Sequence, residues 1–116
     1  MKISGCEDEN LMNEKQDFWD NIYGIKMPSI KRWVLHEPIV DIIPSKQIIT
    51  SESIICEIDL NTCKPSDANF ASKYYLEVYY DSFFQTIVAW FEATFSKCHV
   101  PVLLSTSPYK KTTHWK

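Results

Sequence analysis

Glycine is scarce in this sequence, and its scarcity excludes the usual phosphate-binding loops. Only Gly5 and Gly24 occur in 116 residues. Average usage of about 7% would give roughly eight. The GxGxxG turn and the GxxxxGK[ST] loop need residues without a Cβ atom, because their backbone N–H groups approach a phosphate closely. We therefore expect no standard nucleotide-binding loop within this chain.

Long apolar runs, an excess of positive charge and metal-binding cysteine motifs are also missing. The longest apolar run covers residues 87–91, whereas a membrane-spanning helix needs about 20 residues. Asp plus Glu outnumber Lys plus Arg by 15 to 12, which argues against direct nucleic-acid binding. The sequence has no CxxC motif, and no cysteine lies at zinc-finger spacing from a histidine pair, so we expect no metal site.

The N-terminus lacks the apolar stretch of a secretory signal and becomes acidic at residues 7–9. Four cysteines, Cys6, Cys56, Cys63 and Cys98, allow three disulfide pairings. Without a secretory signal we expect these thiols to stay reduced and partly buried, in a protein of the cytoplasm, the nucleus or both.

Apolar residues are abundant, and their spacing changes along the chain. Hydrophobic residues make up 45% and aromatic residues 14%, which is typical of a folded chain of one domain or part of one. The first 38 residues have helical spacing, with Asp8 or Asn10 as the cap and Gly24 as the end of the first helix. A second, shorter helix is predicted from Pro28 to just before Pro38. The apolar residues that share the first helical face are Leu11, Met12, Phe18, Trp19, Ile22 and Tyr23.

From Ile39 onward the apolar period is two, which predicts antiparallel strands at hairpin distance. The alternating runs cover residues 54–60, 76–80 and 87–95, and a further short strand is predicted at 102–106. The sequence therefore predicts a mainly β fold preceded by a helical hairpin.

An aromatic patch on the predicted helical hairpin leaves two alternatives open. Its members are Phe18, Trp19, Tyr23, Met27 and Trp33. They either pack on the domain's own sheet, which composition alone favours, or await a partner surface.

Few of the polar residues that could carry chemistry stand out. Glu57 and Asp59 share a strand face that is more often solvated than catalytic, and we interpret His99 as structural. His114 and Trp115 follow a polar loop. An imidazole can donate to a carboxylate and an indole can face a cation, which would suit a guanidinium group. The dipeptide alone is a weak indicator.

Five stretches together resemble a known family. They are FWDNIYGIKM (18–27), EPIVDIIPSKQIIT (37–50), VAWFEATFSKCH (88–99), STSP (105–108) and THWK (113–116), and residues 2–8 look like the strand that leads into the family's arm. In this order the chain resembles the C-terminal half of the type I protein arginine N-methyltransferases, the dimerisation arm and β-barrel, along essentially its whole length.

The resemblance implies a parent enzyme in which a Rossmann-like domain binds S-adenosylmethionine and a β-barrel follows. A helical arm reaches the partner's cofactor domain and makes a homodimer. Here residues 1–16 would be the lead-in strand and helix start, 17–38 the dimerisation arm, and 39–116 an incomplete, partial antiparallel β-barrel. The interface positions would be Phe18, Trp19, Tyr23 and Met27.

The same resemblance assigns the arginine cleft to Thr113, His114 and Trp115, with His114 as the catalytic residue that hydrogen-bonds an acidic group elsewhere in the enzyme. The double-glutamate loop and the cofactor site would lie upstream, so this chain alone is expected to be inactive and not to bind S-adenosylmethionine. Usual substrates of the family are Arg-Gly-rich proteins and histone tails. We also consider a noncatalytic, enzyme-like dimerisation subunit and a protein-binding β-module.

Overall fold

The computed structural model describes residues 1–115, and of Met12 only the backbone. Lys116, the last residue of the THWK match, and the Met12 side chain, expected on the helical face, lie outside the described residues. Two compact units are present: Asp8–Asp41, and Met1–Glu7 together with the chain from Ile42 onward. The expected divisions between lead-in and dimerisation arm (16/17) and between arm and partial barrel (38/39) are functional, and they stay predictions.

The helical unit begins with α1 (Glu9–Asp17), whose first turn is capped by Asp8. The Asp8 carboxylate accepts a hydrogen bond of 3.1 Å from the Leu11 backbone N–H, which satisfies one of the donors left open at a helix start. The predicted cap at Asp8 is therefore confirmed. The chain then tightens into the 3₁₀ turn η1 (Phe18–Asp20), so the helix ends before Gly24.

Gly24 lies in a turn between the two helical segments. Tyr23 and Gly24 have φ angles of 52° and 83°, and the backbones of Ile22 and Ile25 exchange hydrogen bonds of 3.0 and 2.9 Å across them. Two successive positive φ angles are typical of a tight hairpin turn, where glycine is tolerated and tyrosine is strained. Gly24 thus has the predicted left-handed backbone, but in this turn.

The second helical segment is short and broken. It consists of α2 (Pro28–Lys31), with the proline in its first turn as predicted, and the 3₁₀ turn η2 (Val34–His36). Lys31 holds it to the first segment through ion pairs of 2.6 Å to Asp20 and 3.8 Å to Asp17. The hydrogen bond to Asp20 is the main cause that raises the Lys31 pKa above its usual value.

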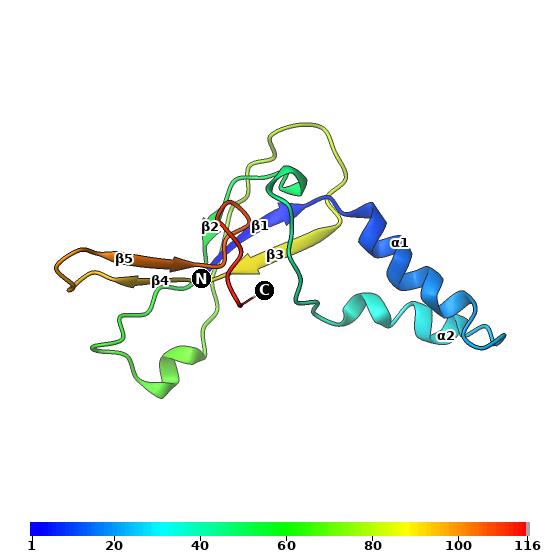
Figure 1. Cartoon of the computed structure of the whole chain (residues 1–116), viewed down its shortest axis with the longest axis horizontal. Coiled ribbons are helices and arrows are strands. Elements are labelled where there is room, and N and C mark those ends of the chain that lie inside the picture. Colours follow the sequence, from blue (N-terminus) through cyan, green and yellow to red (C-terminus); the bar gives the residue numbers. More distant parts are fainter. Residues whose placement is uncertain (116) are drawn as a thin grey trace. The chain divides into compact units, whose positions relative to one another are not determined.

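The main sheet is built around β1 (Lys2–Cys6), which has a strand on each side (Figure 1). It pairs antiparallel with β2 (Ser53–Ile54) and with β3 (Thr86–Trp90), with Lys2 opposite Trp90 and Cys6 opposite Thr86. Residues 2–6 are therefore a strand, as the resemblance implied, although they fall within the first 38 residues, where the spacing predicted helix.

The apolar run 87–95, predicted as one strand, is two strands interrupted at Phe91. The second, β4 (Glu92–Phe95), forms a hairpin with β5 (Val102–Ser105). Phe91 leaves the main sheet because its backbone bonds Thr106: its N–H donates to the Thr106 hydroxyl at 3.1 Å, and its carbonyl accepts from the Thr106 N–H at 3.1 Å. The fold is mainly β with an N-terminal helical hairpin, and the described strands form no closed barrel.

Two predicted strands are mostly loop. The run 54–60 leaves the sheet after Ile54 and turns at Asp59, whose carbonyl accepts from the Cys63 N–H at 2.9 Å. The run 76–80 contributes a single bridge between Val78 and Thr50. Alternating apolar residues were not enough to make these segments strands, because a strand also needs a partner that pairs with it in register.

The core of the β unit is small and partly polar. Its buried apolar side chains are Ile3, Cys6, Ile48, Ile49 and Trp90. The fully buried Ser4 hydroxyl donates to the Thr50 carbonyl at 3.0 Å, and the Gly5 N–H donates to the Thr50 hydroxyl at 2.8 Å. Buried polar groups with partners avoid the cost of desolvation, so these bonds anchor β1.

Membrane spans, metal clusters and disulfides are all missing from residues 1–115. No described helix has the length and apolar character needed to cross a membrane. No group of three or more described His, Cys, Asp or Glu residues is placed to hold a metal ion. In this part of the chain all four cysteines are thiols rather than disulfides.

Gly5→Ala should destabilise the protein. A Cβ atom at Gly5 would lie 2.2 Å from a Phe84 ring carbon and 2.8 Å from Thr50 Cγ2, so we expect a loss of about 1–3 kcal/mol from overpacking. Chemical denaturation measures it. In a Phe84→Ala background, Gly5→Ala should lower the free energy of unfolding by less than it does in the parent sequence, because the ring it meets is gone. Equal effects in both backgrounds would contradict the contact.

Candidate functional site

The Thr113–Trp115 loop is held together by one hydroxyl. Thr113 Oγ1 donates to the Trp115 carbonyl at 2.8 Å and also lies 3.2 Å from the Trp115 backbone nitrogen, which donates to it. The ring centroids of His114 and Trp115 are 5.1 Å apart, and both side chains are exposed. The loop thus brings together the three residues that the resemblance assigned and presents an imidazole and an indole to solvent.

Phe91 anchors this loop from the strand side. Its ring meets the Trp115 ring edge-on, with centroids 6.1 Å apart and planes at 83°, a favoured aromatic geometry. Thr106 fixes the Phe91 backbone, as described above. The same break in the strand that separates β3 from β4 therefore places the aromatic support of Trp115.

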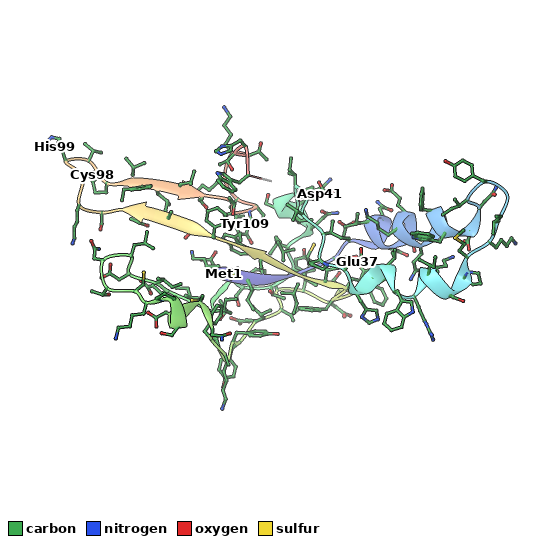
Figure 2. All side chains as sticks on the ribbon, turned by 90° about the horizontal axis from the view of Figure 1, so that it is seen from below. Met1, Glu37, Asp41, Cys98, His99 and Tyr109 are labelled. Carbon is green, nitrogen blue, oxygen red and sulfur yellow. The ribbon has the colours of Figure 1, made fainter. Side chains whose placement is uncertain are left out.

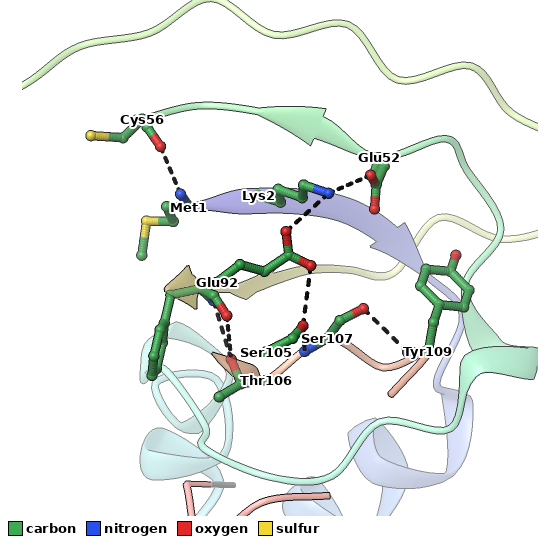
Figure 3. A network of polar contacts seen from close by, with 10 residues as sticks. Met1, Lys2, Glu52, Cys56, Glu92, Ser105, Thr106, Ser107 and Tyr109 are labelled. Atoms are coloured by element: carbon green, nitrogen blue, oxygen red, sulfur yellow. Dashed lines mark hydrogen bonds and ion pairs between the residues drawn. The ribbon is translucent and has the colours of Figure 1, made fainter. Parts of the chain in front are cut away.

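The STSP segment leads from β5 toward the loop by a ladder of serine hydrogen bonds (Figure 3). Ser105 donates to Glu92 Oε1 at 3.1 Å, the Ser107 N–H donates to the Ser105 hydroxyl at 3.2 Å, and the Tyr109 N–H donates to the Ser107 hydroxyl at 3.2 Å. Ser105 and Ser107 are buried. The motif carried the resemblance, but sequence reasoning gave its serines no role.

Lys2 joins the main sheet to this ladder. Its ammonium lies 2.7 Å from Glu52 Oε1 and 3.2 Å from Glu92 Oε2. The hydrogen bond to Glu52 is the main cause that raises the Lys2 pKa, while burial opposes the shift and the Glu92 contact adds to it. Sequence reasoning missed this triad because its members are 40 to 90 positions apart and meet only through strand register.

Other residues considered from the sequence lie elsewhere. Glu57 and Asp59 are exposed and border a cavity of about 430 Å³, whose lining residues all come from the segment between Ile55 and Ser72 and include none of the Thr113–Trp115 loop. A backbone hydrogen bond from Asn61 lowers the Asp59 pKa, so this carboxylate caps a turn. Cys98 and His99 lie at the far tip of the β4–β5 hairpin (Figure 2).

The predicted interface residues lie on the helical unit with unequal exposure. Phe18 is 65% and Tyr23 100% exposed, whereas Trp19 and Met27 are half-buried. Phe18 packs edge-on against Trp19 at 5.4 Å, and the Met27 N–H donates to the Trp19 carbonyl at 3.0 Å. A fully exposed tyrosine with positive φ is the kind of strained position that often has a functional cause.

Residues 1–116 match, over the whole chain, the family described as the arginine methyltransferase oligomerization subdomain. The chain belongs to this arginine methyltransferase family. Protein arginine N-methyltransferase 1 of Schizosaccharomyces pombe is 35% identical over 116 residues, and its counterpart in Chlamydomonas reinhardtii is 34% identical. Each match covers 100% of this chain and 34% of the relative, so the chain spans about a third of the length of these relatives.

A solved structure agrees with these sequence matches. The PRMT1 enzyme–prozyme heterotetrameric complex with AdoHcy from Trypanosoma brucei is similar with a TM-score of 0.86 and 32% sequence identity. The match covers 98% of this chain and 36% of that one. The resemblance to the C-terminal part of the arginine methyltransferases is therefore confirmed.

Neither of the two glycines is placed as in a nucleotide-binding loop. A tight backbone approach to a nucleotide needs glycine, yet Gly5 is packed against Phe84 and Thr50. Gly24 stands in an open turn, where a Cβ atom would have no heavy atom within 4 Å.

Thr113→Val should loosen the loop without unfolding the protein. It removes the hydroxyl that bonds both backbone groups of Trp115, a loss of about 1 kcal/mol of local stability. Hydrogen exchange of the Trp115 amide should quicken severalfold. Thr112→Val, at the exposed neighbouring position, is the matched control and should leave this rate unchanged. Equal rates in both variants would contradict the role of Thr113.

Proposed function

We propose that this chain is the oligomerization and substrate-side part of an S-adenosylmethionine-dependent protein arginine N-methyltransferase. The observation that carries the proposal is the Thr113–Trp115 loop, intact in sequence and supported by the Phe91 ring, within a chain that matches the family along its full length. The parent enzyme would transfer methyl groups to the guanidinium group of protein arginines.

In this proposal the loop closes one side of the arginine cleft. The His114 imidazole, exposed and beside an indole, donates a hydrogen bond to a carboxylate elsewhere in the parent enzyme. Trp115 shapes the pocket and offers a π face to the cation. Transfer to a guanidinium nitrogen needs in-line geometry, and a cleft held closed supplies it.

The helical unit would supply the homodimer contact through Phe18, Trp19, Tyr23 and Met27. Support comes from the description of the family as an oligomerization subdomain and from the exposure of Phe18 and Tyr23. Large exposed aromatic side chains are typical of interface anchors. The strained Tyr23 backbone would then be held by the partner surface in the dimer.

Substrates would be protein arginines, with Arg-Gly-rich segments and histone tails as the classes to try first. The parent would act in the cytoplasm, the nucleus or both, with no direct binding of nucleic acid or membrane. These assignments rest on the family and on the charge balance of this chain.

A second candidate is a noncatalytic subunit that assembles with an active relative. The observation that favours it is the similarity to a structure of an enzyme–prozyme complex. Purifying the full-length protein alone and assaying methyl transfer separates the two. Turnover alone supports the enzyme, whereas turnover that appears only on adding a catalytic relative supports the prozyme-like role.

His114→Ala in the full-length enzyme should lower methyl transfer to an arginine peptide by about 100-fold, because a loosened cleft loses positioning. His99→Ala, at the hairpin tip (Figure 2), is the matched histidine control and should retain activity. Radiolabelled methyl incorporation measures both. Unchanged turnover in His114→Ala would remove the role assigned to His114.

Tyr23→Asp combined with Met27→Asp should shift the full-length protein toward monomer, because two charges would be buried without partners at the interface. Sedimentation velocity measures the shift over a concentration series. Tyr75→Asp, at an 86% exposed tyrosine of the β unit, should sediment like the parent protein. A dimer that persists in the double variant would show that these residues are not the interface.

A further inference from the structure

The Lys2 side chain of β1 bonds two carboxylates from different parts of the β unit. Glu52 precedes β2, and Glu92 begins β4. The Lys2 side chain is 21% exposed and that of Glu92 is 24% exposed, compared with 44% for Glu52. The Lys2–Glu92 pair is therefore the more enclosed of the two, and it is the pair that reaches the β4–β5 hairpin.

Glu92 uses its two oxygens on different partners (Figure 3). Oε2 faces the Lys2 ammonium at 3.2 Å, and Oε1 accepts from the Ser105 hydroxyl at 3.1 Å. Ser105 in turn accepts from the Ser107 N–H. A change in the position of the Glu92 carboxylate is thus transmitted directly to the buried start of the STSP segment.

Phe91 links Glu92 to the Thr113–Trp115 loop. It precedes Glu92 in the chain, its backbone is bonded to Thr106, and its ring supports Trp115. Phe91 and Glu92 lie where β3 passes into β4. Fixing Glu92 from β1 therefore fixes the backbone from which the Trp115 support projects.

We propose that Lys2 is a positioning residue for the Thr113–Trp115 loop, acting through its ion pair with Glu92. This inference rests on the proposed function in so far as the loop binds the substrate arginine. It assigns a positioning role to a residue that lies over 100 positions from the loop and contacts neither His114 nor Trp115 in the described contacts.

The two partners of Lys2 provide an internal control. Glu52 and Glu92 are identical side chains on one ammonium, but the described hydrogen bonds of the Glu52 carboxylate reach only Lys2, whereas Glu92 also bonds Ser105. Because Glu92 bonds Ser105 whether or not Lys2 is present, the contribution of Lys2 is isolated by comparing Lys2→Met in the parent sequence with Lys2→Met in the Glu92→Gln background, where no further effect on the loop is expected. If Lys2 positions the loop, Glu92→Gln should act on the loop and Glu52→Gln should not.

The kinetic test uses the full-length enzyme and an arginine peptide. A partly exposed ion pair changes an equilibrium constant by at most about fivefold. Lys2→Met should therefore raise KM for the peptide by about two- to fivefold, with kcat and the KM for S-adenosylmethionine nearly unchanged. Lys2→Arg, which keeps the charge, should restore the parent KM, and Glu52→Gln should match the parent enzyme.

A second readout does not need activity. Fluorine NMR of protein labelled with 5-fluorotryptophan gives one line for each of the four tryptophans of this chain, and Trp115→Phe identifies the Trp115 line. Lys2→Met and Glu92→Gln should shift or broaden that line, while the lines of Trp19 and Trp33 in the helical unit stay in place. If the parent protein shows no turnover, the proposed function fails while this spectrum still decides the role of Lys2.

Two outcomes would overturn the inference. One is a folded Lys2→Met protein, checked by circular dichroism, with an unchanged peptide KM or an unchanged Trp115 line. The other is an equal effect of Glu52→Gln and Glu92→Gln. Should Lys2→Met fail to fold, Lys2→Gln takes its place, read in the parent sequence and in the Glu92→Gln background.

Discussion

The pairing of β1 on both of its edges is the constraint on which the rest of the β unit depends. The strand bonds β2 and β3 across large sequence separations, and its centre is fixed by buried hydrogen bonds between Ser4, Gly5 and Thr50. Because Phe84 covers Gly5 with no room for a side chain, the register has little freedom. That register places Lys2 opposite Trp90, where its ammonium reaches Glu92, and so determines where the hairpin begins.

The contacts that connect β1 to the segment after β5 are mainly polar, and few belong to an apolar core. Few apolar side chains are fully buried, so packing alone cannot orient the segment from Ser105 to Trp115. Serine hydroxyls, a carboxylate and an ammonium fix the part from Ser105 to Tyr109, and each bond has a defined direction. Loops placed on a rigid scaffold in this way are the usual location of binding residues. The Thr113–Trp115 loop follows that pattern, with one aromatic contact to Phe91.

The sequence predicted what depends on near neighbours. The cap at Asp8, the helix start at Pro28, the left-handed Gly24 and the strand near residues 102–105 are all set within a few residues. The resemblance supplied the three loop residues. The break at Phe91 and the Lys2–Glu92 pair were missed, because alternating apolar residues do not reveal which distant strand will pair. A run that looked like one strand is divided by a hydroxyl fifteen positions away.

A family motif identifies reacting or binding residues, but their supports determine the geometry that those residues adopt. This chain is 35% identical to the Schizosaccharomyces pombe relative over 116 residues, so about two-thirds of the matched positions differ. Effective positioning is sensitive to displacements of about 1 Å. If the loop binds arginine as proposed, two enzymes with the same Thr-His-Trp sequence would therefore favour different arginine peptides when different side chains support it. In this chain the Phe91 ring contacts Trp115, the neighbouring Glu92 bonds Ser105, and the ammonium of Lys2 pairs with Glu92.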